Sequence, residues 1–190
     1  MQFIRTEIPD VLLCQPDIIA DSRGYFVETF CEDELTLFLG YKINFCQDNE
    51  SKSNFGTLRG LHYQLPPFAQ TKLVRVIEGV VLDIVIDIRK GSPTFGKHIS
   101  VELSGKNKTQ VLVPRGFAHG FIVLSQTATF AYKVDNSYSA ENERGIAFDD
   151  TELNLDWKLS IDKIQLSKKD RNQIEFLKAE YFDYKVDLYE

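Results

Sequence analysis

The chain has 190 residues, of which 43% are hydrophobic, and a formal net charge of −6. This length and composition allow one substantial core, so we expect a single domain over residues 1–190. The acidic balance argues against a nucleic-acid surface. Early charged residues exclude a secretory signal, and Asp83 and Asp87 interrupt the strongest apolar segment, which excludes a membrane span. Three cysteines without CxxC spacing favour free thiols in the cytoplasm.

The first third of the chain predicts an aromatic strand and one helix. Residues 21–30 have the composition of a turn followed by a strand rich in Phe and Tyr. Residues 32–39 predict an α-helix, because acidic residues occupy its first turn and Gly40 follows its last. Residues 47–53 are polar and turn-rich, so we expect a loop that leads into residues 56–64.

From Lys72 onward, short segments that alternate apolar and polar residues predict a series of strands. Besides the segment that starts at Lys72, the expected strands are residues 81–89, 98–103, 110–113, 117–124 and 127–134. Residues 104–107 are expected to form a hairpin-like turn, and the last two strands a pair. Strands at such short intervals, with glycine and proline between them, indicate an all-β sandwich or barrel.

The C-terminal part has a weaker pattern. Residues 157–161 are expected to form a short strand and residues 167–179 a helix. The helix would begin at Ser167, with Asp170 three residues later as in a capping box. The aromatic tail, residues 181–189, is expected to pack on the barrel or on a second subunit.

Residues 56–64 bring together side chains that can bind an anion and move protons. An arginine such as Arg59 can hold an anionic group through two hydrogen bonds, and His62 can transfer protons near neutral pH. A regular strand would point the two to opposite faces. Either Gly60 marks a bulge, or Arg59 acts at the end of the strand or across a dimer. The three histidines include no HxH pair, so no metal site is expected.

Each further candidate residue also has a purely structural explanation. His119 and Tyr132 are equally compatible with positions in the core. Lys72 could be an ordinary lysine at a strand end, and Asp170 could simply cap the expected helix.

Considered together, six motifs strongly resemble the dTDP-4-dehydrorhamnose 3,5-epimerase family of nucleotide-sugar enzymes. The motifs are Asp21-Ser22-Arg23-Gly24-x-Phe26-x-Glu28-x-Phe30, Gln47-x-Asn49-x-Ser51, Leu58-Arg59-Gly60-Leu61-His62-Tyr63-Gln64, Lys72-Leu73-Val74-Arg75-Val76, Pro114-x-Gly116-Phe117-Ala118-His119-Gly120-Phe121 and Tyr132-Lys133. The resemblance runs from about residue 5 to about residue 175.

The resemblance implies a cupin-type jelly roll with a few short helices, one of them near the C-terminus. It also implies a homodimer in which an N-terminal strand joins the partner's sheet. The family converts dTDP-4-dehydro-6-deoxy-D-glucose to dTDP-4-dehydro-L-rhamnose, through enolates at C3 and C5, without metal or organic cofactor. Two alternatives stay open: an epimerase for a related 4-keto sugar with another outcome or nucleotide, and a non-catalytic sugar-nucleotide binding protein.

By the same resemblance, His62 is expected to be the general base, Asp170 its carboxylate partner and Tyr132 the acid on the opposite face. Lys72 is expected to stabilise the enolate. The residues expected to bind the substrate are Arg23, Glu28, Gln47, Asn49, Arg59, His119, Tyr138 and Glu143. These roles suit the chemistry, because a hydrogen beside a ketone is acidic only if the enolate oxygen is stabilised and inversion needs an acid opposite the base.

Overall fold

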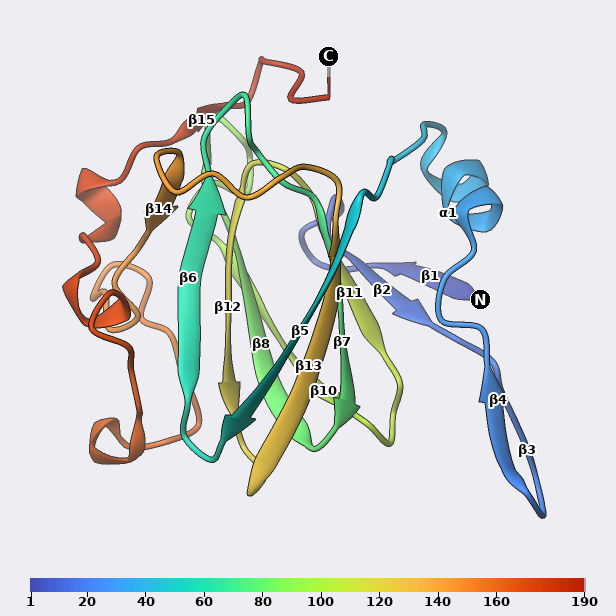
Figure 1. Cartoon of the computed structure of the whole chain (residues 1–190). Helices are drawn as coiled ribbons and strands as arrows, with labels where there is room; N and C mark the ends of the chain where they lie inside the picture. The colour runs from blue at the N-terminus through green and yellow to red at the C-terminus, as the bar shows by residue number, and fades with distance from the viewer. Residues whose placement is uncertain (190) are drawn as a thin grey trace.

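The computed structural model describes residues 1–189, and two antiparallel β-sheets packed face to face form its body (Figure 1). The six-stranded sheet has the order β1 (Gln2–Arg5), β2 (Leu12–Gln15), β11 (Gln110–Val113), β7 (Lys72–Glu78), β13 (Thr127–Val134) and β5 (Gln47–Asn54). The five-stranded sheet has the order β10 (His98–Ser104), β8 (Val80–Asp87), β12 (Phe117–Val123), β6 (Leu58–Gln64) and β14 (Glu143–Gly145). The prediction of an all-β sandwich is confirmed.

Successive strands alternate between the two sheets from β5 to β8 and from β10 to β14, as in a jelly roll. Two local predictions are therefore wrong. The turn at residues 104–107 connects β10 to β11 in the other sheet, and β12 and β13 also lie in different sheets. Alternation of apolar residues indicates that a segment is a strand, but it carries no information about the strand beside it.

β8 shows how the sandwich is filled, because both of its faces are buried. Val81 and Val85 lie in the core between the two sheets. Ile84 and Ile86 pack on the other side, in a second core that the C-terminal segment covers. The inner face of β8 also carries Asp83, which is buried between the sheets.

The helix α1 (Glu32–Leu39) forms where it was predicted. Gly40 ends it with φ 83°, and the Gly40 N–H donates to the Thr36 carbonyl at 2.9 Å. Leu35 packs with Leu12 and Leu73 on the outer face of the six-stranded sheet. Among the residues that the structure describes, no helix has the length and apolar character needed to cross a membrane.

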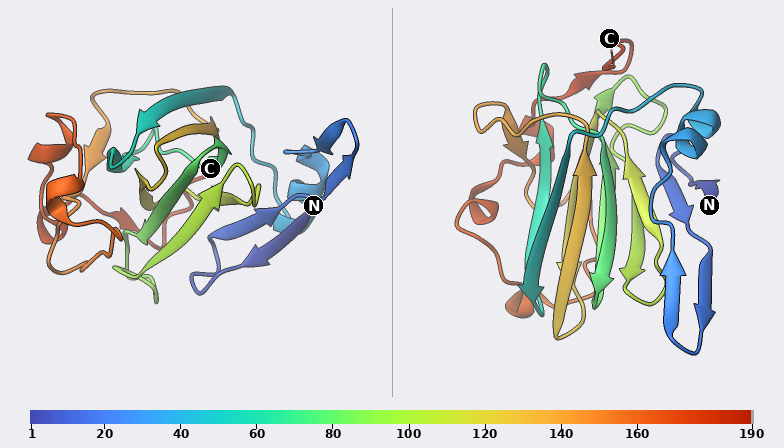
Figure 2. Two further views of the ribbon diagram at one scale, coloured as in Figure 1. Left: turned by 90° about the horizontal axis from the view of Figure 1, so that it is seen from below. Right: turned by 45° about the vertical axis from the view of Figure 1, so that its right-hand side comes forward.

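The strands β3 (Ile18–Asp21) and β4 (Gly24–Val27) form a hairpin that projects from the sandwich (Figure 2). The predicted turn and aromatic strand are confirmed. Ile19 and Phe26 are each 66% exposed, and Ile18 and Tyr25 are also exposed. Large apolar side chains left in solvent on a two-stranded ribbon are typical of a contact surface.

Residues 47–53 form a strand rather than the predicted loop. Although β5 is polar, it pairs with β13 along its whole length, from Gln47 opposite Val134 to Asn54 opposite Thr127. It lies at the edge of the sheet, where one face stays in solvent, so its polar side chains remain solvated while the backbone is hydrogen-bonded.

Two predictions for the C-terminal segment are wrong. Residues 167–179 contain only the 3₁₀ helices η2 (Asp170–Asn172) and η3 (Phe176–Lys178), because Ile174 between them is extended and forms a bridge with Ile146. Residues 157–161 are not a strand; Trp157 is buried and donates to the Phe148 carbonyl at 2.8 Å. Further elements here are η1 (Ile161–Lys163), β15 (Phe182–Asp183) and its partner β9 (Arg89–Lys90). Tertiary contacts override the local helix pattern.

Candidate active site

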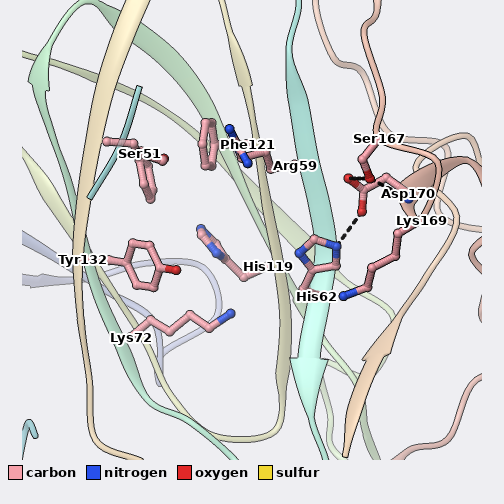
Figure 3. A pocket seen from close by; sticks show the side chains of 11 residues that line it. Ser51, Arg59, His62, Lys72, His119, Phe121, Tyr132, Ser167, Lys169 and Asp170 are labelled. Atoms are coloured by element: carbon pink, nitrogen blue, oxygen red, sulfur yellow. Dashed lines mark hydrogen bonds and ion pairs between the residues drawn. The ribbon is translucent and has the colours of Figure 1, made fainter. Parts of the chain in front are cut away.

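A cavity of about 280 Å³ lies between the two sheets, and the C-terminal segment borders it at one side (Figure 3). The six-stranded sheet contributes one wall and the five-stranded sheet the opposite one. The six-stranded sheet provides Ser51, Lys72, Phe130 and Tyr132, and the five-stranded sheet provides Arg59, His62, His119 and Phe121. The C-terminal segment adds Ser167, Lys169 and Asp170. All four residues predicted to be catalytic are among them.

A bulge in β6 brings Arg59 and His62 to the same cavity. The three-residue step between them faces a two-residue step in β12, so β6 carries one extra residue. Gly60, with φ 138°, lies inside this step, and a Cβ there would lie 2.5 Å from the Gly120 Cα. A bulge at Gly60 is therefore what brings Arg59 and His62 to one side of the strand. The bulge requires glycine at position 60, because the backbone there passes so close to Gly120.

His62 and Asp170 form a hydrogen-bonded pair in the cavity wall. The His62 Nε2–H donates to the Asp170 Oδ1 at 2.6 Å, which leaves Nδ1 free toward the cavity (Figure 3). The Ser167 hydroxyl donates to Asp170 Oδ2 at 2.7 Å and accepts the Asp170 backbone N–H at 3.0 Å. Burial opposes ionisation of Asp170, but the hydrogen bonds from His62 and Ser167 lower its pKa. Ser167 and Asp170 thus form reciprocal hydrogen bonds, although no helix begins at Ser167, and the Asp170 carboxylate also orients the histidine.

Tyr132 and Lys72 belong to the opposite wall. The Tyr132 ring reaches into the cavity from β13, and the Lys72 side chain enters from the start of β7 (Figure 3). Burial raises the pKa of Tyr132, an effect that nearby Arg59 opposes and Glu143 reinforces. Burial also lowers the pKa of Lys72 to about 8, although the Glu143 carboxylate works in the other direction. The wall thus holds a protonated phenol and an ammonium of unusually high acidity.

His119 lines the cavity and contacts a second carboxylate, Asp83, that sequence reasoning missed. Its Nε2–H donates to Asp83 Oδ2 at 2.8 Å, and both residues are buried. Asp83 Oδ1 has no hydrogen-bond partner within residues 1–189. The charge of Asp83 helps to keep Lys72 protonated. The signal for Asp83 in the sequence was a carboxylate with apolar residues on both sides of it.

Tyr138 and Glu143 contact each other, and Glu143 also contacts Lys169, a residue of the cavity lining. The Tyr138 hydroxyl donates to Glu143 Oε2 at 2.7 Å, and Lys169 forms an ion pair with the same oxygen. Although partial burial acts in the opposite direction, the contacts with Lys169 and Tyr138 lower the pKa of Glu143. Lys169 and Ser167 line the cavity but were not among the predicted site residues, although both flank Asp170 in the sequence.

Gln47 and Asn49 lie on the cavity side of β5. Asn49 stands opposite Tyr132 and Ser51 opposite Phe130, so these side chains share a face. The Gln47 amide donates to Asn49 Oδ1 at 2.7 Å. The two polar residues therefore extend the six-stranded wall beyond Ser51.

Arg23 and Glu28 do not line the cavity, and they lie on or next to the β3–β4 hairpin. Arg23 lies at the tip of the β3–β4 hairpin, where its side chain is 88% exposed and pairs with Asp21 at 2.6 Å. Glu28 follows β4 and lies close to Cys31 and Glu34 instead. One copy of the chain thus assembles the acid–base groups without these two residues.

The chain matches known epimerases in sequence and in structure. Residues 5–178 match the protein family described as dTDP-4-dehydrorhamnose 3,5-epimerase. The enzyme of that name from Shigella flexneri is 51% identical over 182 residues, which cover 96% of this chain and 99% of the relative.

Solved structures agree with this match. A dTDP-6-deoxy-D-glucose-3,5-epimerase from Legionella pneumophila, crystallised with dTDP-4-keto-L-rhamnose, has 43% identity and a TM-score of 0.93, over 97% of this chain and 99% of that one. A 3'-monoepimerase from Streptomyces bikiniensis, crystallised with dTDP-quinovose, has 30% identity and a TM-score of 0.88, over 95% and 93%. The resemblance in the motifs is confirmed: this chain belongs to the dTDP-4-dehydrorhamnose 3,5-epimerase family and is an isomerase of nucleotide sugars.

Proposed function

We propose that His62, Asp170, Tyr132 and Lys72 epimerise dTDP-4-dehydro-6-deoxy-D-glucose at C3 and C5 to give dTDP-4-dehydro-L-rhamnose. One observation carries this assignment: His62 and Tyr132 belong to opposite sheets and face one cavity from its two sides (Figure 3). Inversion at carbon needs a base on one face and an acid on the other. A binding protein needs neither.

The first half of each epimerisation uses His62 and Lys72. The free Nδ1 of His62 takes the proton from the carbon beside the ketone, and Asp170 stabilises the resulting imidazolium. The C–H electrons move into the C4 carbonyl, whose oxygen becomes an enolate near the Lys72 ammonium. A positioned base supplies roughly 10²–10⁴-fold and a donor at the oxyanion roughly 10²–10³-fold more.

In the second half, Tyr132 gives its proton to the opposite face of the carbon. Its raised pKa keeps the phenol protonated before the transfer. The phenolate that follows is stabilised by Arg59, which acts against the rise in the Tyr132 pKa. Exchange of protons with water then restores His62 and Tyr132 for the second carbon.

Incubation with dTDP-4-dehydro-6-deoxy-D-glucose in deuterated water tests this function. We expect deuterium at both C3 and C5, measured by NMR, and a rate of incorporation lower by roughly 10²–10⁴-fold with His62→Ala. Exchange at C3 alone would favour the narrower activity of the 3'-monoepimerase that this chain resembles. Tight binding without exchange at any pH would support a binding protein, and undiminished exchange in His62→Ala would refute the assignment of the base.

We propose further that the active form is a homodimer in which the β3–β4 hairpin of one copy reaches the cavity of the other. The hairpin exposes Ile19 and Phe26 to solvent. It also carries Arg23, and Glu28 follows it, while the cavity has no contact with either within one chain. Docking would bury the apolar surface and bring Arg23 to the diphosphate of the substrate.

A complementation experiment tests the dimer. In a mixed dimer of His62→Ala and Arg23→Ala chains, an exchanged hairpin produces one site with both defects and one intact site. At low substrate concentration we therefore expect activity well above that of either parent. If Arg23 served its own chain's cavity, mixing would restore nothing.

We also propose that the enzyme works in the cytoplasm. Cys14, Cys31 and Cys46 are all free thiols in the structure, as is usual for proteins of a reducing compartment. Cell fractionation with an antibody against the chain checks this location, and recovery outside the cytoplasm would contradict it.

A further inference from the structure

The last residues of the chain run from the wall that carries His62 to the wall that carries Lys72. At the first wall, the Tyr63 hydroxyl donates to the Glu180 carbonyl at 2.8 Å. Phe182 is buried against the Tyr63 ring, with 5.9 Å between ring centroids. Tyr63 directly follows His62 in β6, so this part of the tail holds the segment that positions the proposed base.

At the second wall, the tail holds the residue before Lys72. The Tyr189 hydroxyl forms a hydrogen bond of 2.8 Å with the Thr71 hydroxyl, and Thr71 is fully buried. The Arg115 guanidinium donates to the Leu188 carbonyl at 2.6 Å, and the Arg115 backbone N–H donates to the Tyr189 hydroxyl at 3.3 Å. The end of the tail is therefore attached to Thr71, directly before β7 begins at Lys72.

Asp135 closes a ring of contacts around this attachment. One carboxylate oxygen accepts the Thr71 N–H at 2.6 Å, and the other accepts from Arg115 Nε at 3.1 Å. Asp135 directly follows β13, the strand of Tyr132. The ring thus connects the tail to the start of β7, the strand of Lys72, and to the end of β13, the strand of Tyr132.

We propose that the C-terminal tail, residues 179–189, is a strap that fixes the separation of the two cavity walls, with Tyr63 and Tyr189 as positioning residues for His62 and Lys72. The proposal rests on the roles given to His62 and Lys72 under the proposed function. The family match covers residues 5–178, and the strap follows this range. A base and an oxyanion donor on separate sheets need such a constraint, because a misplacement of about 1 Å can slow a reaction by roughly 10²-fold.

Removing single hydroxyls tests the strap. Tyr189→Phe should lower kcat about three- to tenfold, the order expected for one lost hydrogen bond, with KM unchanged within about twofold. Tyr63→Phe should have a similar effect, and the double variant roughly the product of the two. Tyr184→Phe is the matched control: its ring lies over Arg89, and its hydroxyl has no hydrogen bond within the described part of the chain. Its kcat should equal that of the wild type.

Amide hydrogen exchange measures the strap without relying on activity. In Tyr189→Phe, exchange at residues 70–74 should accelerate, while Tm stays within about 3 °C of the wild type. A lower Tm with unchanged kcat would show a merely structural role and overturn the proposal, as would unchanged kcat and unchanged exchange in the double variant. If wild-type enzyme itself incorporates no deuterium at C3 and C5, the proposed function fails, while local exchange at residues 70–74 still decides whether the tail restrains this wall.

Discussion

The cavity and the β3–β4 hairpin carry residues predicted by the same resemblance, but those of the cavity lie together and those of the hairpin lie apart from them. His62, Tyr132 and Lys72 come from three strands in two sheets and line one cavity. Arg23 is 88% exposed at the tip of a ribbon whose apolar side chains face solvent. The chain by itself thus assembles the proposed acid–base groups and leaves the hairpin exposed.

This difference separates chemistry from recognition. Groups that move protons must be held to within a fraction of an ångström, which a packed sandwich achieves within one chain. A residue that anchors a charged part of the substrate tolerates more freedom, so a surface ribbon can supply it across an interface. Changes inside the cavity should therefore affect kcat, and changes on the hairpin should affect KM.

The largest effect is expected from His62→Ala. Without a base, deuterium incorporation at C3 and C5 should fall by roughly 10²–10⁴-fold, measured by NMR. His98→Ala serves as the control, because His98 lies on β10 and does not line the cavity. Equal losses in the two variants would indicate damage to the fold instead of loss of a base.

Lys72→Met should lower kcat by roughly 10²–10³-fold, the effect of removing an oxyanion donor. It should also raise Tm at pH 7, because burial lowers the pKa of Lys72 to about 8 and so makes its charged form unfavourable in the folded state. Lys52→Met, on the exposed face of β5, is the control and should change neither quantity. A lower Tm with unchanged kcat would contradict a catalytic role.

Activity and stability of the wild type should diverge above pH 8. Since the pKa of Lys72 is about 8 in the folded protein and 10.5 ordinarily, the unfolded chain binds more protons between these values. The contribution of Lys72 to stability therefore rises with pH in this window. kcat should instead fall about tenfold per pH unit as the ammonium is lost. Steady-state rates and denaturant unfolding at matched pH measure both trends; a flat kcat profile up to pH 10 would exclude the ammonium as donor.

The smallest effect is expected on the hairpin. Arg23→Ala should raise KM about tenfold, as for the loss of a hydrogen bond to a charged group, with kcat nearly unchanged. The exposed Lys97 provides a control for the loss of one positive charge, and Lys97→Ala should leave KM unaltered. A fall in kcat without a change in KM would place Arg23 in the chemistry and remove the distinction between the two regions.

Local signals predicted some elements with correct boundaries. α1 formed at residues 32–39 because its acidic first turn and the glycine after its end both favour helix termini. β13 formed at residues 127–134 because its alternation matches a sheet with a buried face. β11 formed at residues 110–113, where all four residues are buried. Polar β5 gave no such signal, since its stability comes from pairing with β13 rather than from burial.

The residues of the candidate site could be predicted from the sequence, but their arrangement could not. The motifs identified His62, Lys72, Tyr132 and Asp170 as candidates, because the residue types that acid–base chemistry needs are visible in the chain itself. Their arrangement depended on contacts between distant segments. Asp170 reaches His62 across 108 positions of sequence, and the segment that carries it is not the predicted helix.

The sequence by itself determined the strands β7, β8, β10, β11, β12 and β13, the helix α1, the family and the chemical groups available for catalysis. The tertiary structure alone decided which strands are neighbours, that the bulge at Gly60 brings Arg59 and His62 to one cavity, and that Asp83 lies behind His119. The physical reason is range: propensity, capping and alternation act over a few residues, whereas sheet pairing and burial join positions that no local pattern relates.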